Sequence, residues 1–114
     1  MEIYVPNNLK KIYTTEQQAR QINNIILLYI DKNSIITDAT SCIGGNSYYF
    51  SKIFKSVISV EKDYNTCKYL LYNTRNLKNI KVYNCSYNII KYCLKQDIIF
   101  LDPPWGGNIY KTKK

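Results

Sequence analysis

Histidine is absent from this chain of 114 residues, and its four cysteines, Cys42, Cys67, Cys85 and Cys93, include no Cys-x-x-Cys pair. Because zinc and many transition-metal sites are built from histidine and closely spaced cysteine, we expect no metal centre. No apolar segment reaches the length of a signal peptide or a membrane span, which disfavours a secreted disulfide framework and a membrane protein. We therefore expect an intracellular protein, of the cytoplasm or the nucleus, with reduced thiols.

Internal repeats, low-complexity tracts and linker-like segments are also lacking, so nothing in the sequence marks a domain boundary. A chain of 114 residues is large enough for one hydrophobic core, but it is short for a complete doubly wound enzyme. We predict one domain over residues 1–114, with an irregular segment at residues 1–13 and the folded part at residues 14–114.

Arginine is scarce: the chain has two arginines against 14 lysines. Isoleucine, lysine, asparagine and tyrosine make up 56 of the 114 residues, and their codons are A/T-rich, from which we infer an A/T-rich genome. This bias accounts for part of the net charge of +8 but not for the whole excess of basic over acidic residues. The remaining excess is compatible with a polyanionic partner such as RNA or DNA, although the lysines near both ends of the chain suit solvated termini equally.

The spacing of apolar residues predicts helices that alternate with strands. Thr14 and Thr15 each stand three residues before a glutamine, as in a capping box, and Asp63 is placed to cap a later helix. The predicted strands are 34–38, 56–60, 80–83 and 97–101, and the predicted helices are 15–31, a segment after Gly44-Gly45-Asn46, 63–77 and 88–94. Such alternation implies right-handed crossovers and a parallel sheet. We predict an α/β fold with a Rossmann-like sheet in the order 3-2-1-4, covered by helices on both faces and truncated after strand four.

The most specific motif is Asp102-Pro103-Pro104-Trp105-Gly106-Gly107, which directly follows the last predicted strand. In open α/β sheets, ligands bind at the carboxyl ends of the strands. A carboxylate and the Pro103 carbonyl can accept hydrogen bonds from an exocyclic NH2 group while the Trp105 ring stacks on the base. A plain turn of proline and glycine is the alternative, and it explains Asp-Pro alone better than it explains the whole hexapeptide.

Two other predicted strand ends carry polar or flexible residues. The first strand ends at Asp38, and the Gly44-Gly45 pair that follows lets a ligand approach the backbone at a helix N-terminus. The second strand leads to Glu61, whose carboxylate can accept two hydrogen bonds from a ribose diol. Taken singly, each feature has a simpler explanation, which is a tight turn for the glycines, a surface position for Glu61 and a helix cap for Asp63.

Asp38, the Gly44-Gly45 pair, Glu61 and the hexapeptide from Asp102 occur along the chain in the order that S-adenosylmethionine-dependent methyltransferases use. Over residues 14–110 the chain resembles the trimethylguanosine synthase group of class I RNA methyltransferases, which methylate N2 of the cap guanine, and Pro103–Gly107 is the most specific part of the likeness. The resemblance implies a cofactor site for S-adenosylmethionine, with Glu61 at the ribose and Ser86 near the adenine. The residues implied at the methionine end and beside the reactive methyl group are Asp38, Gly44, Gly45, Asn46 and Asp102.

The resemblance also implies a substrate side, with a capped RNA 5′ end as the partner. Trp105, with Gly106 and Gly107, would hold the guanine of a 7-methylguanosine cap, whose cationic ring adds cation-π attraction to stacking. Asp102, the Pro103 carbonyl and Trp105 would form the catalytic set by aiming N2 at the methyl group. Catalysis would then be largely positioning.

Three departures from the family pattern bear on the substrate. Cys42 stands where the first turn usually has a glycine, Ser86 stands where an acid is expected, and Asp102 replaces the serine common in cap synthases. Asp102 is closer to nucleic-acid amino methyltransferases. Two alternatives therefore stay open: amino-methylation of an internal guanine or adenine of RNA or DNA, and a non-catalytic fragment that only binds a nucleotide or RNA.

The last predicted strand, 97–101, has an apolar composition with almost no charge. In the order 3-2-1-4 this strand would lie at an edge of the sheet, where an apolar strand tends to pair with other chains. We therefore expect self-association through this strand, or a complementary C-terminal half that pairs with it.

Overall fold

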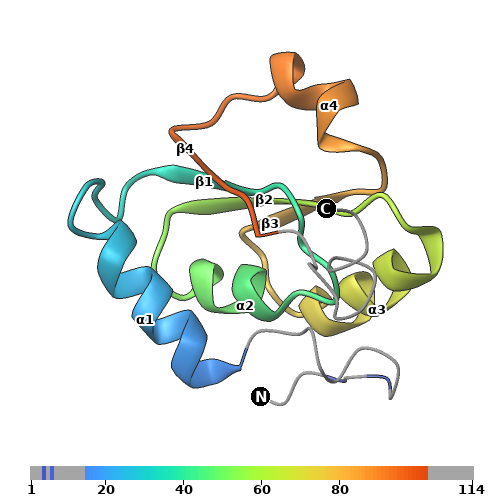
Figure 1. The fold of residues 1–114 in the computed structure, drawn as a ribbon, viewed down its shortest axis with the longest axis horizontal. Helices are drawn as coiled ribbons and strands as arrows, with labels where there is room; N and C mark the ends of the chain where they lie inside the picture. Colours follow the sequence, from blue (N-terminus) through green and yellow to red (C-terminus); the bar gives the residue numbers. More distant parts are fainter. Residues whose placement is uncertain (1–3, 5, 7–14, 103–114) are drawn as a thin grey trace, which may run out of the picture.

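The computed structural model describes Tyr4, Pro6 and residues 15–102, and it forms a four-stranded parallel sheet with helices packed on it (Figure 1). The strands lie in the order β3-β2-β1-β4, which confirms the predicted fold class and strand order. The elements are α1 (Glu16–Ile26), β1 (Ile35–Asp38), α2 (Gly45–Ser51), β2 (Ser56–Val60), α3 (Tyr64–Thr74), β3 (Ile80–Tyr83), α4 (Tyr87–Ile90), a 3-10 turn η2 (Lys91–Cys93) and β4 (Ile98–Phe100).

The sheet register aligns the carboxyl ends of all four strands. Asp38 of β1 is opposite Ser59 of β2 and Phe100 of β4, and Val60 is opposite Tyr83 of β3. The loops that follow the four strands therefore emerge at one edge of the sheet, which is where open α/β sheets bind ligands.

Side-chain caps fix the start of two helices as predicted. Thr15 and Gln18 form a reciprocal capping box, in which the Gln18 amide donates to Thr15 Oγ1 (3.3 Å) and the Thr15 amide donates to Gln18 Oε1 (3.0 Å). Asp63 caps α3 by accepting a hydrogen bond from the Thr66 amide (2.8 Å). The predicted cap at Asp63 is thereby confirmed.

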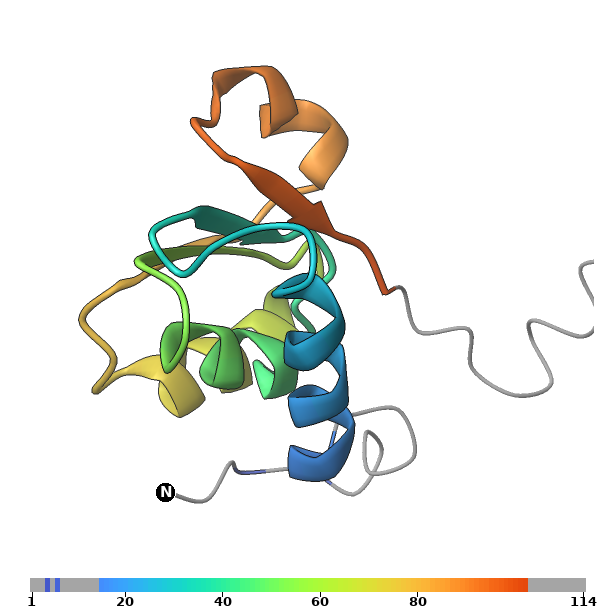
Figure 2. The ribbon, with the colours of Figure 1, turned by 90° about the vertical axis from the view of Figure 1, so that its left-hand side faces the viewer.

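One face of the sheet carries the hydrophobic core. Figure 2 shows α1, α2 and α3 on this face and α4 on the opposite side. The core cluster lies between the sheet and the first two helices and consists of Ile26, Ile36, Phe50, Phe54 and Val57. The ring of Phe100 packs against Phe50 with centroids 5.2 Å apart, which anchors β4 to the same core.

The opposite face is covered less than the sequence predicts. Within the described residues, this face has only the short α4 and the turn η2, and α4 contains no buried residue. Ile99, which pairs with Thr37, is 47% exposed. The second face is therefore less covered than we predicted, because an apolar strand composition does not show how much of each face a helix covers. The longest helices described, α1 and α3, have 11 residues each, and neither is long and apolar enough to cross a membrane.

Candidate cofactor and substrate site

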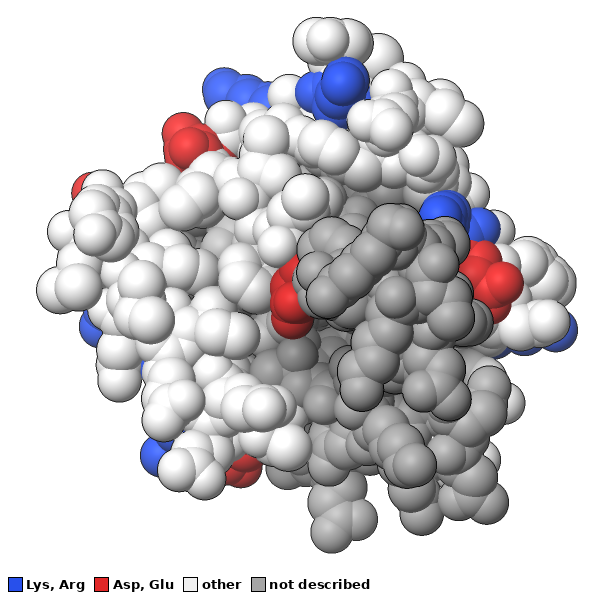
Figure 3. Space-filling view, viewed as in Figure 1, with Lys and Arg blue, Asp and Glu red and all other residues white. Residues whose placement is uncertain are grey.

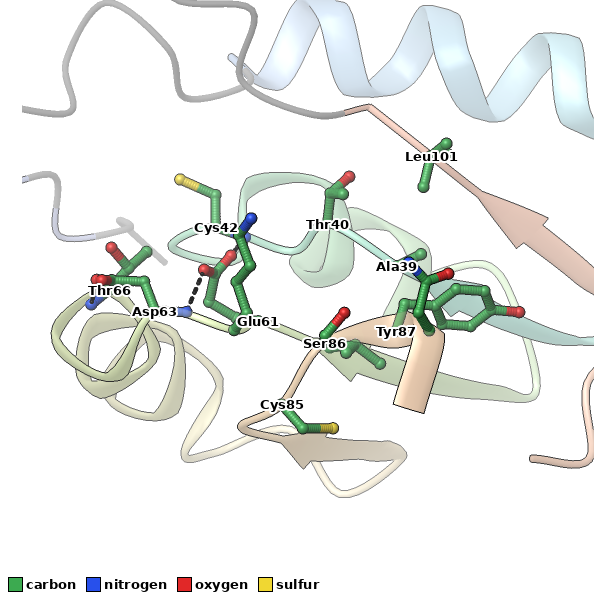
Figure 4. Close-up of a pocket in the computed structure, with 13 residues that line it drawn as sticks. Ala39, Thr40, Cys42, Glu61, Asp63, Thr66, Cys85, Ser86, Tyr87 and Leu101 are labelled. Carbon is green, nitrogen blue, oxygen red and sulfur yellow. Dashed lines mark hydrogen bonds between the residues drawn. The ribbon is translucent and has the colours of Figure 1, made fainter. Parts of the chain in front are cut away.

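A cavity of about 580 Å³ opens at the carboxyl edge of the sheet, within the size range of small-molecule sites. It lies among the loops that follow β1, β2 and β3 and the end of β4 (Figure 4). Its lining includes Thr40, Cys42, Glu61, Asp63, Ser86 and Leu101. The structure thus brings Glu61 and Ser86, predicted as cofactor residues, to one cavity.

Glu61 is the best-held functional side chain of this cavity. One carboxylate oxygen, Oε1, accepts a hydrogen bond from the Cys42 amide (2.8 Å), and Oε2 accepts one from the Asp63 amide (2.9 Å) (Figure 4). The Asn84 side chain donates to the Glu61 carbonyl (2.8 Å), which fixes the backbone as well. Because an ionised carboxylate offers about four acceptor positions, two remain for a diol.

The turn after β1 contains two residues with positive φ, at Cys42 (54°) and Gly44 (101°). A Cβ atom at Gly44 would lie 3.0 Å from Leu70 Cδ1, so glycine suits this position both for its φ and for the space available. Cys42 carries a Cβ in the left-handed region, at a cost of about 1–2 kcal/mol. The restriction of the backbone that we predicted at Cys42 therefore corresponds to its positive φ.

Gly44, Gly45 and Asn46 are buried and do not line the cavity. Their backbone forms the turn and the start of α2, while the preceding residues of the turn, Ala39, Thr40 and Cys42, face the cavity. Burial raises the pKa of the Cys42 thiol to about 11, so that this thiol is protonated at neutral pH. Contacts of the three predicted residues with a cofactor stay a prediction.

Asp38 lies behind the turn, with 1% of its surface exposed. Its Oδ2 accepts a hydrogen bond from Ser47 Oγ (2.7 Å), and Ser47 in turn accepts one from Ser59 Oγ (2.6 Å). Oδ1 is buried and has no hydrogen-bond partner among the described residues. Burial is the main cause that raises the pKa of Asp38 to about 7, against the opposing effect of the Ser47 hydrogen bond. This geometry suits a residue that shapes the turn.

Ser86 lies at the start of α4, with its hydroxyl in the space between Glu61 and Tyr87 (Figure 4). This hydroxyl makes no capping hydrogen bond to α4, so it is available to a ligand within the described part of the chain. Sequence reasoning missed the neighbouring lining residues Thr40, Thr66 and Tyr87. They belong to no motif, and only the placement of their loops brings them here.

Asp102, the first residue of the hexapeptide, lies beside the first turn. Its amide donates a hydrogen bond to Thr40 Oγ1 (2.8 Å), and the preceding Leu101 lines the cavity. The fourth strand end therefore joins the first strand end, as the order 3-2-1-4 requires. Pro103, Trp105, Gly106 and Gly107 lie outside the described residues.

The charges of the cavity contrast with the net charge of the chain. Two acids, Glu61 and Asp63, and one base, Lys62, line the cavity, and the charges of Asp102 and Glu61 both act on Asp38. The net charge of the chain is +8, yet the basic groups seen on the face in Figure 3 are scattered, with acidic groups among them. Acidic groups outnumber basic groups in this lining, which suits a cationic ligand such as a sulfonium with an amino group.

Comparisons with known proteins are consistent with this architecture. Residues 33–114 match a family model described as RNA cap guanine-N2 methyltransferase. Among curated proteins, the uncharacterised protein L320 of Acanthamoeba polyphaga mimivirus is 32% identical, in an alignment that covers 96% of this chain and 54% of L320.

Solved structures share the fold. PH1948 from Pyrococcus horikoshii superposes with a TM-score of 0.68 and 23% identity, covering 94% of this chain and 55% of PH1948. An O-methyltransferase from Bacillus cereus, solved in complex with S-adenosylhomocysteine, has a TM-score of 0.69 and 15% identity, with 84% of this chain and 48% of that protein covered. The chain thus spans about half the length of these relatives. Since the family match includes every strand of the sheet and the whole cavity edge, this chain belongs to the family of RNA cap guanine-N2 methyltransferases, whose cofactor is S-adenosylmethionine.

Proposed function

We propose that this protein is an S-adenosylmethionine-dependent RNA methyltransferase that acts on an exocyclic amine, N2 of the guanine in a 7-methylguanosine cap. The observation that carries the proposal is the placement of Glu61 at the rim of a 580 Å³ cavity, where two backbone amides orient its carboxylate. Asp102 lies at the same edge, through its bond to Thr40. The acid that we assign to the ribose and the acid that we assign to the amine therefore lie at the same edge of the sheet.

The residues present fit this cofactor. Glu61 has acceptor positions left for the two ribose hydroxyls, and the Ser86 hydroxyl faces the side where we place the adenine. Ala39, Thr40 and Cys42 border the end of the cavity that we assign to the methionine part, with Asp38, Gly44, Gly45 and Asn46 shaping the turn from behind. When bound, the cofactor supplies an electrophilic methyl group on a sulfonium.

The contribution of the protein to the reaction is positioning. In this proposal the Asp102 carboxylate and the Pro103 carbonyl accept hydrogen bonds from the guanine NH2 group, and Trp105 stacks on the cationic base with Gly106 and Gly107 beside it. These contacts hold the nitrogen lone pair in line for attack, which is worth more to the rate than a strong base.

One observation favours a second candidate, an amino-methyltransferase for an internal guanine or adenine of RNA or DNA. Asp102 stands where cap synthases commonly have serine, and its carboxylate matches any exocyclic amine equally well. A third reading, a fragment that binds without catalysis, predicts cofactor binding and no methyl transfer.

A methyl-transfer assay with labelled S-adenosylmethionine separates these readings. The substrates are a 7-methylguanosine cap analogue, an uncapped guanine-containing RNA and an adenine-containing RNA. We expect transfer to the cap analogue, and Asp102→Ala should lower kcat more than it raises KM, because a misaimed nitrogen loses reaction geometry. Transfer only to uncapped RNA would support the second candidate, and wild-type kcat in Asp102→Ala would contradict the role of Asp102.

The edge of β4 away from β1 supports a further part of the proposal, namely that another strand pairs with β4. Within the described residues β4 pairs only with β1, and Ile99 and Leu101 are 47% and 64% exposed. We propose that self-association or a complementary C-terminal half covers this edge. Light scattering of the isolated chain distinguishes a dimer from a monomer, and a soluble monomer with full activity would argue against both.

A further inference from the structure

A second hollow, of about 510 Å³, lies on the outer side of α3 and is lined mainly by tyrosines. Tyr4 stacks on Tyr69 with ring centroids 5.5 Å apart and planes 23° apart, and its ring meets Tyr72 edge-on at 6.4 Å. Tyr4 and Tyr72 are each 53% exposed. We call Tyr4, Tyr69 and Tyr72, with the neighbouring Asn65 and Lys68, the tyrosine platform.

A buried amide builds this platform. Asn73 is 1% exposed, and its side chain pairs with the Tyr4 backbone by accepting from the Tyr4 amide (2.8 Å) and donating to the Tyr4 carbonyl (2.9 Å). The same amide group donates to the Ile43 carbonyl (2.8 Å), in the turn that borders the cofactor cavity. Tyr4 is therefore held against α3 by specific hydrogen bonds, although half of its surface faces solvent. Because Tyr4 is half exposed, these hydrogen bonds do not serve the packing of the core.

Positive charges accompany the aromatic rings. Arg75 lies over the Tyr72 ring at 3.9 Å, and Lys68 lies over the ring of Tyr64, itself 65% exposed, at 4.8 Å. In the part of the chain that the structure describes, the one ion pair joins Glu16 to Arg20, so no carboxylate there neutralises Lys68 or Arg75. Exposed aromatic side chains beside cations that have no carboxylate partner among the described residues match a polyanion that carries flat bases.

We propose that the tyrosine platform, with Tyr64 and Arg75, binds single-stranded RNA by stacking its bases while Lys68 and Arg75 contact phosphates. The inference rests on the proposed function, because it assigns part of the binding of the RNA substrate to a surface outside the methyl-transfer site. The two sites adjoin on the first turn of α3, where Thr66 lines the cofactor cavity and Asn65 lines the platform. RNA bound on the platform would therefore lie next to the cavity that we assign to the cofactor.

The test measures RNA affinity by fluorescence anisotropy, with a labelled single-stranded RNA and the whole protein. Because stacking is worth a factor of about 5 to 150 in affinity per base, Tyr72→Ala should weaken binding by that factor and Tyr72→Phe should restore it. Tyr92→Ala is the matched control, since Tyr92 is 89% exposed and has Lys91 over its ring at 5.1 Å, but lies in η2. Equal loss in Tyr72→Ala and Tyr92→Ala would overturn the proposal.

Salt dependence supplies a second measurement that does not depend on stacking. Lys68→Gln should reduce the slope of log affinity against log salt by about 0.7, the value for one phosphate contact of a single strand, whereas Lys91→Gln should leave it unchanged. Wild-type RNA affinity in both Tyr72→Ala and Lys68→Gln would assign this face to another partner, such as a protein, and overturn the proposal. Methyl transfer by the wild-type protein is measured separately. If RNA binding depends on Tyr72 but no RNA is methylated, the platform stands and the proposed function fails.

Discussion

Asp38 should make the stability of this protein depend on pH between about 4 and 7. Its carboxyl group is 1% exposed, and burial raises its pKa from 3.8 to about 7. Because the chain has no histidine, no other side-chain type in it has an ordinary pKa between about 5 and 8. A change in stability across this range therefore points to Asp38.

The sign of the effect follows from the raised pKa. The folded protein keeps a proton on Asp38 at pH values at which the unfolded chain has released it, so the free energy of unfolding falls as the pH rises. The slope approaches about 1.4 kcal/mol per pH unit and vanishes above the folded pKa. Between pH 5 and pH 7 we expect a loss of about 2–3 kcal/mol, equivalent to a fall in Tm on the order of 10 °C.

Asp38→Asn tests this reasoning, because asparagine preserves the shape of the side chain and cannot ionise. Its amide oxygen can accept the Ser47 hydrogen bond that Oδ2 accepts in the native protein. Urea denaturation at pH 5, 6, 7 and 8 should show a sloping profile for the native chain and a flat one for Asp38→Asn, with Asp63→Asn as an exposed control that keeps the slope. Parallel profiles for the native chain and Asp38→Asn would refute the argument.

Three further expectations concern the site. Glu61→Ala should weaken cofactor binding about tenfold to a few hundredfold, since two charge-assisted hydrogen bonds are lost and water compensates in part. Calorimetry with S-adenosylhomocysteine measures this change. Unchanged affinity would mean that Glu61 only connects the Cys42 and Asp63 turns. Cys42→Gly should raise the free energy of unfolding by about 0.5–1 kcal/mol by relieving the positive φ, whereas Cys42→Ala, which keeps the Cβ, should not. Trp105→Ala should weaken cap-analogue binding while cofactor affinity stays near that of the native protein; joint loss of both affinities and a lower Tm would make Trp105 a core residue.

The strand order could be predicted because it depends on local patterns that the chain repeats. Each strand is a short apolar run between helical segments, and right-handed crossovers leave few ways to arrange four of them. The caps at Thr15 and Asp63 were predictable for the same reason, since the side chain and the amide that it accepts from are three residues apart. A sequence pattern can predict contacts between residues that are near one another in the chain.

The end of the first helix was not predictable in this way. The periodic apolar residues indicate a helix to residue 31, but α1 ends at Ile26 and a turn follows. Leu28 is 77% exposed and Tyr29 is 82% exposed, so neither has a core to pack against. Spacing alone cannot show whether a surface is present opposite an apolar residue.

The orientation of Asp38 was also beyond the sequence. An acid at the end of the first strand is visible in the motif, but its direction depends on Ser47 of α2, which donates to its carboxylate and itself accepts from Ser59 of β2. Ser47 and Ser59 carry no motif of their own, and neither is at a spacing from Asp38 that a local pattern predicts. The predicted and observed sites therefore agree on which loops meet, while the side chains that reach the cavity, such as Thr40, emerge only from their placement.

The first turn is the centre of the candidate site, because side-chain bonds tie it to two of the other strand ends. Glu61, after β2, accepts from the Cys42 amide, and Asp102, after β4, donates from its amide to Thr40. The third strand end is tied in through Asn84, which donates to the Glu61 carbonyl. All four strand ends are thus linked by bonds that join a side chain to a backbone group. Since the acid proposed for the ribose and the acid proposed for the amine are both fixed to one turn, the conformation of that turn sets their relative position, and positioning is what the proposed reaction requires of its protein.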